Sequence, residues 1–165
     1  MIQEFVNSNR KLISFYSKNV LSIGQILVFA GLASIAFFAF QSATQEHYKD
    51  AWYKVVLNST TAIIFPGIIT IMIAKICACL LEPEKRPHFL LRHGDVILYL
   101  YAAALVSNAT ISGFSVSNMK LDTFSIWAML IPAVLGSAFK AFVIAGLGPI
   151  IRKLVPAIQE SMETV

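Results

Sequence analysis

The stretch VLSIGQILVFAGLASIAFFAFQSATQ, residues 20–45, contains no charged side chain and decides the class of this protein. Three further stretches share that property: residues 55–74, 96–119 and 123–139. The hydrocarbon core of a bilayer is about 30 Å thick and a helix rises about 1.5 Å per residue, so about 20 apolar residues can span it. The sequence therefore predicts four transmembrane helices. They cover about residues 20–40, 56–81, 96–116 and 124–147.

The remaining residues fit a single membrane domain. The 165 residues are 57% hydrophobic and 13% charged, whereas ordinary soluble domains are about 25% charged. We therefore expect an all-α, polytopic integral membrane protein, with one domain over residues 1–165 that is a bundle of four transmembrane helices. Residues 1–19 and 149–165 place apolar and charged side chains on opposite sides at helical spacing, which predicts a short amphipathic helix at each end. A plain helical extension into the cytoplasm is the alternative for residues 1–19. Gly148-Pro149 predicts a break before the second of these helices.

The distribution of Lys and Arg predicts the orientation. Eight of them would lie on the side that holds both termini and the central loop: Arg10, Lys11, Lys18, Lys85, Arg86, Arg92, Arg152 and Lys153. Three would lie on the other side: Lys49, Lys54 and Lys120. Loops rich in Lys and Arg stay in the cytoplasm. We therefore expect both termini in the cytoplasm, and the bacterial inner (plasma) membrane as the location.

Small residues recur about once per helical turn in two of the predicted spans, and a first-span glycine joins them. The set is Gly31 in the first span, Ala62, Pro66, Thr70 and Ala74 in the second, and Ala128, Pro132 and Gly136 in the fourth. Small side chains let helix backbones approach closely, which favours packing in lipid. We expect these residues to lie in helix–helix contacts. Pro66 also predicts a kink, because proline removes one backbone hydrogen bond.

Polar side chains inside the spans are the candidate functional residues. By the helix rise, Lys75 and Lys140 lie in the cytoplasmic half, about 7–9 Å from the midplane, and a lysine at that depth can snorkel to the headgroups. Gln25 and Asn108 predict hydrogen bonds between helices, or else the lining of a polar path. Gln25, Asn108 and Lys140 together form the candidate intramembrane polar site.

The segment between the second and third spans is the most charged in the chain. Its residues Lys85, Arg86, Arg92 and His93 are candidates for contact with lipid headgroups or with a cytoplasmic partner. Its acidic and histidine residues match no metal-ligand spacing, and the chain contains no catalytic motif. We therefore expect no metal, no cofactor and no catalytic residue. The basic residues form no dense stripe that would bind nucleic acid.

Two functions are consistent with this pattern. The first is a small non-enzymatic membrane protein that serves as a structural or assembly subunit of a larger complex, such as secretion- or conjugation-type machinery. Its partners would be the lipid bilayer and other subunits or copies of itself. The alternative is a homo-oligomeric pore or transporter-like protein, in which Gln25, Asn108 and Lys140 line the path. The segments outside the spans are too short for a receptor or enzyme domain.

Overall fold

The computed structural model describes residues 2–44, 52–82, 88–117 and 123–163, and these are almost entirely helical with no strand. The elements in chain order are α1 (Ile2–Ser8), α2 (Arg10–Thr44), α3 (Trp52–Ser59), the π-helical turn η2 (Thr60–Ile64), α4 (Phe65–Leu81), α5 (Phe89–Arg92), α6 (Gly94–Ser117) and α7 (Thr123–Glu163). The predicted all-α class is confirmed.

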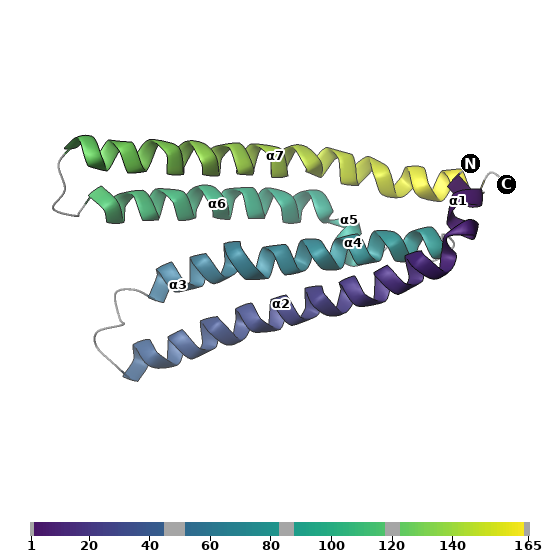
Figure 1. The fold of residues 1–165 in the computed structure, drawn as a ribbon, viewed down its shortest axis with the longest axis horizontal. Helices are drawn as coiled ribbons and strands as arrows, with labels where there is room; N and C mark the ends of the chain where they lie inside the picture. The colour runs from purple at the N-terminus through teal and green to yellow at the C-terminus, as the bar shows by residue number, and fades with distance from the viewer. Residues whose placement is uncertain (1, 45–51, 83–87, 118–122, 164–165) are drawn as a thin grey trace.

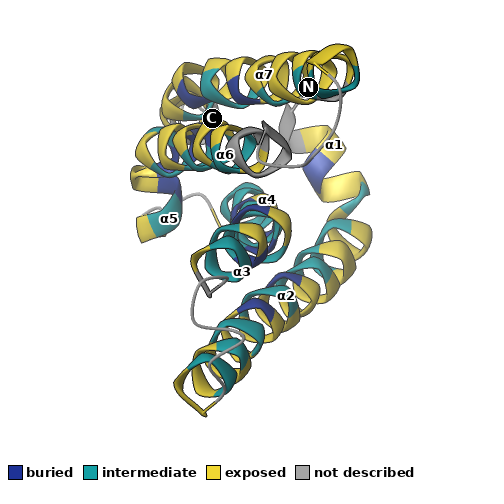
Figure 2. Cartoon of the chain, turned by 90° about the vertical axis from the view of Figure 1, so that its left-hand side faces the viewer, coloured by how far each residue is buried: buried dark blue, intermediate teal, exposed yellow. Residues whose placement is uncertain are grey.

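Two helical hairpins make up the molecule (Figure 1). In the first, α2 packs along α3, η2 and α4, and in the second, α6 packs along α7. Contacts between the hairpins are fewer: α3 and η2 meet α6, while α4 meets α7. Viewed end-on, α2 and α7 lie at opposite extremes with α3, α4 and α6 between them (Figure 2). Both termini lie at the same end of the molecule (Figure 1).

A small buried cluster holds the hairpins together near the termini. Met72 of α4, Leu91 of α5 and Val155 of α7 form its centre, and Met72 is only 1% exposed. Gly94 begins α6 beside this cluster, where an added Cβ would lie 2.8 Å from both Met72 and Ile151. The end of the fold that carries the termini is therefore its best-packed region.

Large apolar side chains cover the surface of the long helices. Phe29 of α2 is 71% exposed, and Phe124 and Phe142 of α7 are 81% and 78% exposed. Soluble monomers rarely expose contiguous apolar surface on this scale. Within the described residues, four helices are long and apolar enough to cross a membrane, as the sequence predicted: Arg10–Thr44, Tyr53–Leu81, Gly94–Ser112 and Thr123–Ile158.

The helix ends differ from the sequence prediction in two places. Only Ile2–Ser8 forms a separate N-terminal helix, because α2 runs without interruption from Arg10 into the first span. At the other end, α7 continues through Gly148-Pro149 to Glu163, so the predicted break is wrong. Tertiary packing explains the continuity. Gly148 is buried against α6, and Val155 beyond the proline is buried in the cluster.

Glycines bring the α2 and α4 backbones together. A Cβ added to Gly24 would lie 2.8 Å from the carbonyl oxygen of Gly67, and one added to Gly67 would lie 3.0 Å from the carbonyl oxygen of Gly24. Two helical turns further along α2, a Cβ added to Gly31 would lie 2.5 Å from Ile64. No larger residue fits at these positions without separating the helices, which is how small residues support packing between membrane helices.

Substitution of Gly24 tests this contact. Gly24→Ala should lower the free energy of unfolding by about 1–3 kcal/mol, because the added methyl group meets backbone atoms that cannot rotate away. Gly146→Ala is the matched control, since nothing lies within 4 Å of its Cβ position. It should leave stability unchanged or raise it by about 0.5–1 kcal/mol, the usual advantage of alanine in a helix. Denaturant titration in mild detergent measures both, and equal effects of the two variants would contradict the contact.

Candidate functional site: polar groups within the apolar helices

A π-helical turn precedes Pro66. The N–H of Phe65 donates to the carbonyl of Thr60, five residues back, instead of four as in an α-helix. Pro66 has no N–H, and its ring would collide with the carbonyl of Ala62 in a regular helix. The wider turn η2 accommodates the proline, and π turns of this kind are common at functional sites. The irregularity that the sequence predicts at Pro66 takes this form.

A hydrogen bond between the two hairpins has its acceptor in this turn. The side-chain amide of Asn108 on α6 donates to the hydroxyl of Thr61 at 3.1 Å, and that hydroxyl in turn donates to the carbonyl of Leu57 at 2.8 Å. Thr61 is 4% exposed. Close by along the same two helices, the rings of Phe65 and Tyr101 stack with centroids 4.8 Å apart. These two contacts fix α6 against the first hairpin.

Lys140 lies about one helical turn closer to the termini than Asn108. The register follows from the backbone contacts: a Cβ added to Gly148 would lie 3.4 Å from the Cα of Asp95. Because α6 and α7 are antiparallel and rise equally per residue, this register places Lys140 opposite Ala103. Lys140 is exposed, and the amide of Asn108 is directed to Thr61.

Gln25 does not join them. It is exposed on α2, next to Gly24, which packs against Gly67. Gly67 lies almost two turns closer to the termini than Thr61. Gln25 and Lys140 also belong to the two outermost helices (Figure 2). Within one chain, the three candidate polar residues therefore do not line a common path.

The small residues of the second span are placed unequally. Ala74 is buried, and its carbonyl accepts a hydrogen bond of 3.1 Å from the hydroxyl of Ser17. Pro66 and Thr70 are half-buried, and the Thr70 hydroxyl donates to the Pro66 carbonyl at 2.7 Å. Ala62 is exposed. The contacts of α4 with α2 are therefore made by Ala74 and by Gly67, which lay outside the predicted set.

The predicted small residues of α7, Ala128, Pro132 and Gly136, are exposed, as are all residues from 131 to 136. A Cβ on Gly136 would meet no atom within 4 Å. Here the file Ala128, Pro132, Gly136 and Lys140 is called the α7 outer face. A single chain leaves this face uncovered.

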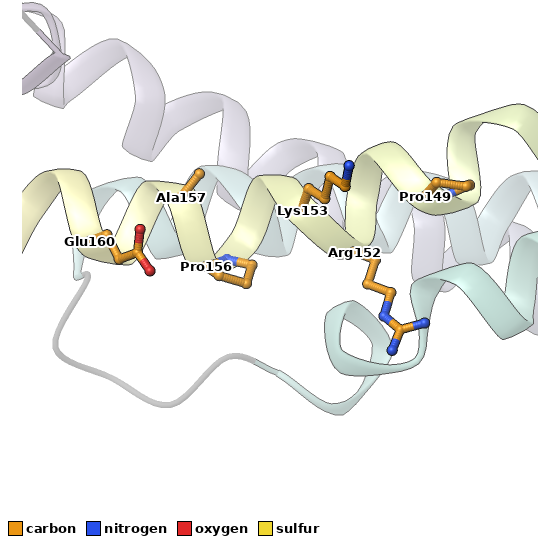
Figure 3. Close-up of a pocket in the computed structure, with 6 residues that line it drawn as sticks. All are labelled: Pro149, Arg152, Lys153, Pro156, Ala157 and Glu160. Carbon is orange, nitrogen blue, oxygen red and sulfur yellow. The ribbon is translucent and has the colours of Figure 1, made fainter.

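The end that carries the termini is rich in cations. A hollow of about 540 Å³ lies there along α7 (Figure 3), lined by Pro149, Arg152, Lys153, Pro156, Ala157 and Glu160. A second hollow, on α1 and α2, includes Arg10, Lys11 and Lys18 in its lining. Five of the eight cations that the sequence assigns to the side of the termini thus lie at one end of the fold: Arg10, Lys11, Lys18, Arg152 and Lys153.

The described part of the central segment contains one helical turn, α5. His88 precedes α5 and its Nδ1 accepts a hydrogen bond of 3.3 Å from the N–H of Leu90. Arg92 and His93 are exposed, and the His93 ring lies against Phe89 with centroids 4.7 Å apart. Lys85 and Arg86 lie outside the described residues. In the part of the chain that is described, no three His, Cys, Asp or Glu residues are grouped to hold a metal ion.

The pKa of His88 is lowered from its ordinary 6.5 by partial desolvation of the ring and, to a smaller degree, by the charge of Lys75. The folded protein therefore favours the neutral ring, whose Nδ1 can accept the bond from Leu90. As the pH falls below 6.5, the unfolded chain takes up the proton first, so the α5 turn should lose stability in acid and keep it above that value.

An NMR titration of the His88 ring in detergent micelles, followed together with amide exchange at Leu90, measures this effect. We expect a pKa below 6.5 and faster exchange as the ring titrates. His88→Asn keeps a capping acceptor without a titrating group, and should keep the turn while removing its pH dependence. A ring pKa above 6.5 would contradict this account.

The described site is therefore a hydrogen-bonded junction of two hairpins, with an exposed cation about one helical turn away on α7. Its groups are two hydrogen-bonded side chains, a stacked aromatic pair and one ammonium. These groups can bind neighbouring helices or attract negative charge. No protein-family model matches the chain, and no curated protein or solved structure matches it significantly.

Proposed function

We propose that the protein spans the bacterial inner membrane four times, with both termini and the segment before α5 in the cytoplasm. The apolar surfaces of the long helices support insertion, because lipid is the solvent in which such surfaces are favourable. The gathering of Arg10, Lys11, Lys18, Arg152 and Lys153 at the end that holds the termini supports the orientation.

Cysteine labelling tests this topology. In a chain with Cys77→Ala and Cys79→Ala, a cysteine at Glu160 should react only when the reagent reaches the cytoplasmic side. A cysteine at Lys120 should react only from the opposite side. Labelling of intact cells and of inverted vesicles with a membrane-impermeant maleimide distinguishes the two, and reaction of both positions from one side would overturn the four-span arrangement.

We propose further that the protein is a non-enzymatic structural or assembly subunit of a larger membrane complex, such as secretion- or conjugation-type machinery. The observation that carries this proposal is the α7 outer face. Gly136 costs about 0.5–1 kcal/mol of helix stability relative to alanine, and Pro132 removes a backbone hydrogen bond. In α2 and α4 the cost of each buried glycine is offset by close packing. No described residue packs against Gly136 to offset its cost, as expected for a face that packs against another subunit.

A substitution on this face separates assembly from folding. Gly136→Leu should leave the stability of the purified chain unchanged, because nothing lies near its Cβ position, while about tenfold less of the chain migrates in its native complex. Ala138→Leu is the matched control, since Ala138 is also exposed but lies about 160° around α7 at about 100° per residue. Native electrophoresis of mild-detergent extracts gives the readout. A wild-type chain that migrates alone would refute the assembly role.

The alternative function is a homo-oligomeric pore or transporter-like protein. The exposure of Lys140 within the apolar part of α7 favours it, because copies could place this charge around a shared path. Against it, Asn108 is already bonded to Thr61 and Gln25 lies at another level. Conductance of the purified protein in planar bilayers tests the pore directly. A current whose ion selectivity reverses in Lys140→Glu would establish it in place of the assembly role.

A further inference from the structure

The register of the two hairpin helices sets the depth of Lys140. Trp127 on α7 and Tyr99, which lies beside Gly148, are the aromatic side chains that would lie at the two membrane interfaces. Trp127 and Gly148 are about 31 Å apart along α7 at the helical rise, which matches a hydrocarbon core of about 30 Å. With the interfaces at Trp127 and Gly148, Lys140 lies about 4 Å from the midplane at the helical rise.

At this depth the lysine stem does not reach water. The headgroups begin about 15 Å from the midplane, and an extended lysine places its ammonium about 6 Å from the helix surface. The charge of Lys140 therefore remains about 5 Å inside the hydrocarbon, whichever way the side chain is extended. Lys75 differs, since its charge acts on His88, which is outside the spans. Lys140 is the charge that needs a partner within the membrane.

Neither this chain nor a second copy can supply that partner. Among the described residues no carboxylate forms an ion pair with Lys140, and none of the nine Asp and Glu residues of the sequence lies in the four uncharged stretches. Along the α6–α7 hairpin, Asp95 lies beside Gly148 and is therefore about 12 Å from Lys140 in level, by the helical rise. Copies of the chain that lie side by side in the membrane would bring together lysines and no acid. The partner charge must come from a different protein.

We propose that the α7 outer face is the docking surface for a transmembrane helix of another protein, and that this helix carries an Asp or Glu near the middle of its span. The proposal rests on the assembly role and names the chemistry of the partner. Ala128, Pro132 and Gly136 extend over about two turns, and Lys140 follows one turn further along. Their small side chains let a second backbone approach closely. The carboxylate on that helix would meet the Lys140 ammonium as a charge-paired hydrogen bond.

A defined probe tests the charge requirement. The probe is a synthetic transmembrane helix of leucine and alanine with one central Asp and a glycine four residues before it. Its controls carry Asn or Lys in place of the Asp. Energy transfer between the labelled peptide and the purified full-length protein in phosphatidylcholine vesicles measures binding. We expect the Asp peptide to bind about tenfold more tightly than the Lys peptide.

Variants of Lys140 complete the test. Lys140→Met should remove the preference for Asp over Lys, and Lys140→Glu should reverse it. Lys153→Met is the matched control and should keep the preference, because Lys153 lies at the cationic end of α7 outside the span. Lys140 is exposed, so these variants should fold, which circular dichroism checks. Equal binding of the Asp and Lys peptides to wild type, or a preference unchanged in Lys140→Met, would overturn the proposal.

The two proposals fail in different ways. If wild type migrates alone in native extracts, the assembly role is wrong whatever the peptides do. If wild type migrates in a complex that Lys140→Met and Lys140→Glu leave intact, the assembly role stands and the acidic partner helix is refuted. Loss of the complex in Lys140→Glu but not in Lys153→Met, together with the peptide preference, supports the acidic partner.

Discussion

Pro66 has no N–H to donate, and the centre of the molecule is arranged around that missing hydrogen bond. In an apolar surrounding each unsatisfied backbone group is costly, so a spanning helix must repair such a gap locally. Here the repair is the turn η2, in which Phe65 reaches the carbonyl of Thr60. The same turn contains Thr61, whose buried hydroxyl accepts a hydrogen bond from the side-chain amide of Asn108. A backbone defect thus coincides with the point at which the second hairpin is attached to the first.

This attachment sets the positions of the outer residues. The Asn108–Thr61 bond contributes about 0.6–2 kcal/mol in a membrane, a modest energy but a directional one, because amide and hydroxyl must meet in one register. Stacking of Phe65 on Tyr101 and the packing of Gly94 against Met72 fix the same register at two further points. Since α7 follows α6 along its length, the level of Lys140 is determined by contacts in which Lys140 takes no part.

Composition was sufficient to predict the class of the fold. Four uncharged stretches of spanning length appear in the structure as four long apolar helices, because length and apolarity are local properties. The contacts between helices could not be predicted from the local sequence. Gly148-Pro149 has the local pattern of a helix break, yet packing of Gly148 on α6 and of Val155 in the core keeps α7 continuous. The sequence identifies Asn108 as a polar residue in a span. Its partner Thr61 is one of several hydroxyl residues in the second span, and only the register of α6 against η2 selects Thr61.

The glycines of α2 and α4 pack closely against neighbouring helices, whereas Gly136 of α7 does not. Gly24, Gly31 and Gly67 each lie where a Cβ would collide with a neighbour. Gly136 meets nothing within 4 Å, although glycine weakens a helix there as it does elsewhere. In the proposed membrane placement, Lys140 would add the cost of a charge in hydrocarbon, about 2.5–3.5 kcal/mol near the middle of a span. The proposed partner helix would offset both costs, since close backbone approach would use the glycine and a carboxylate would neutralise the lysine.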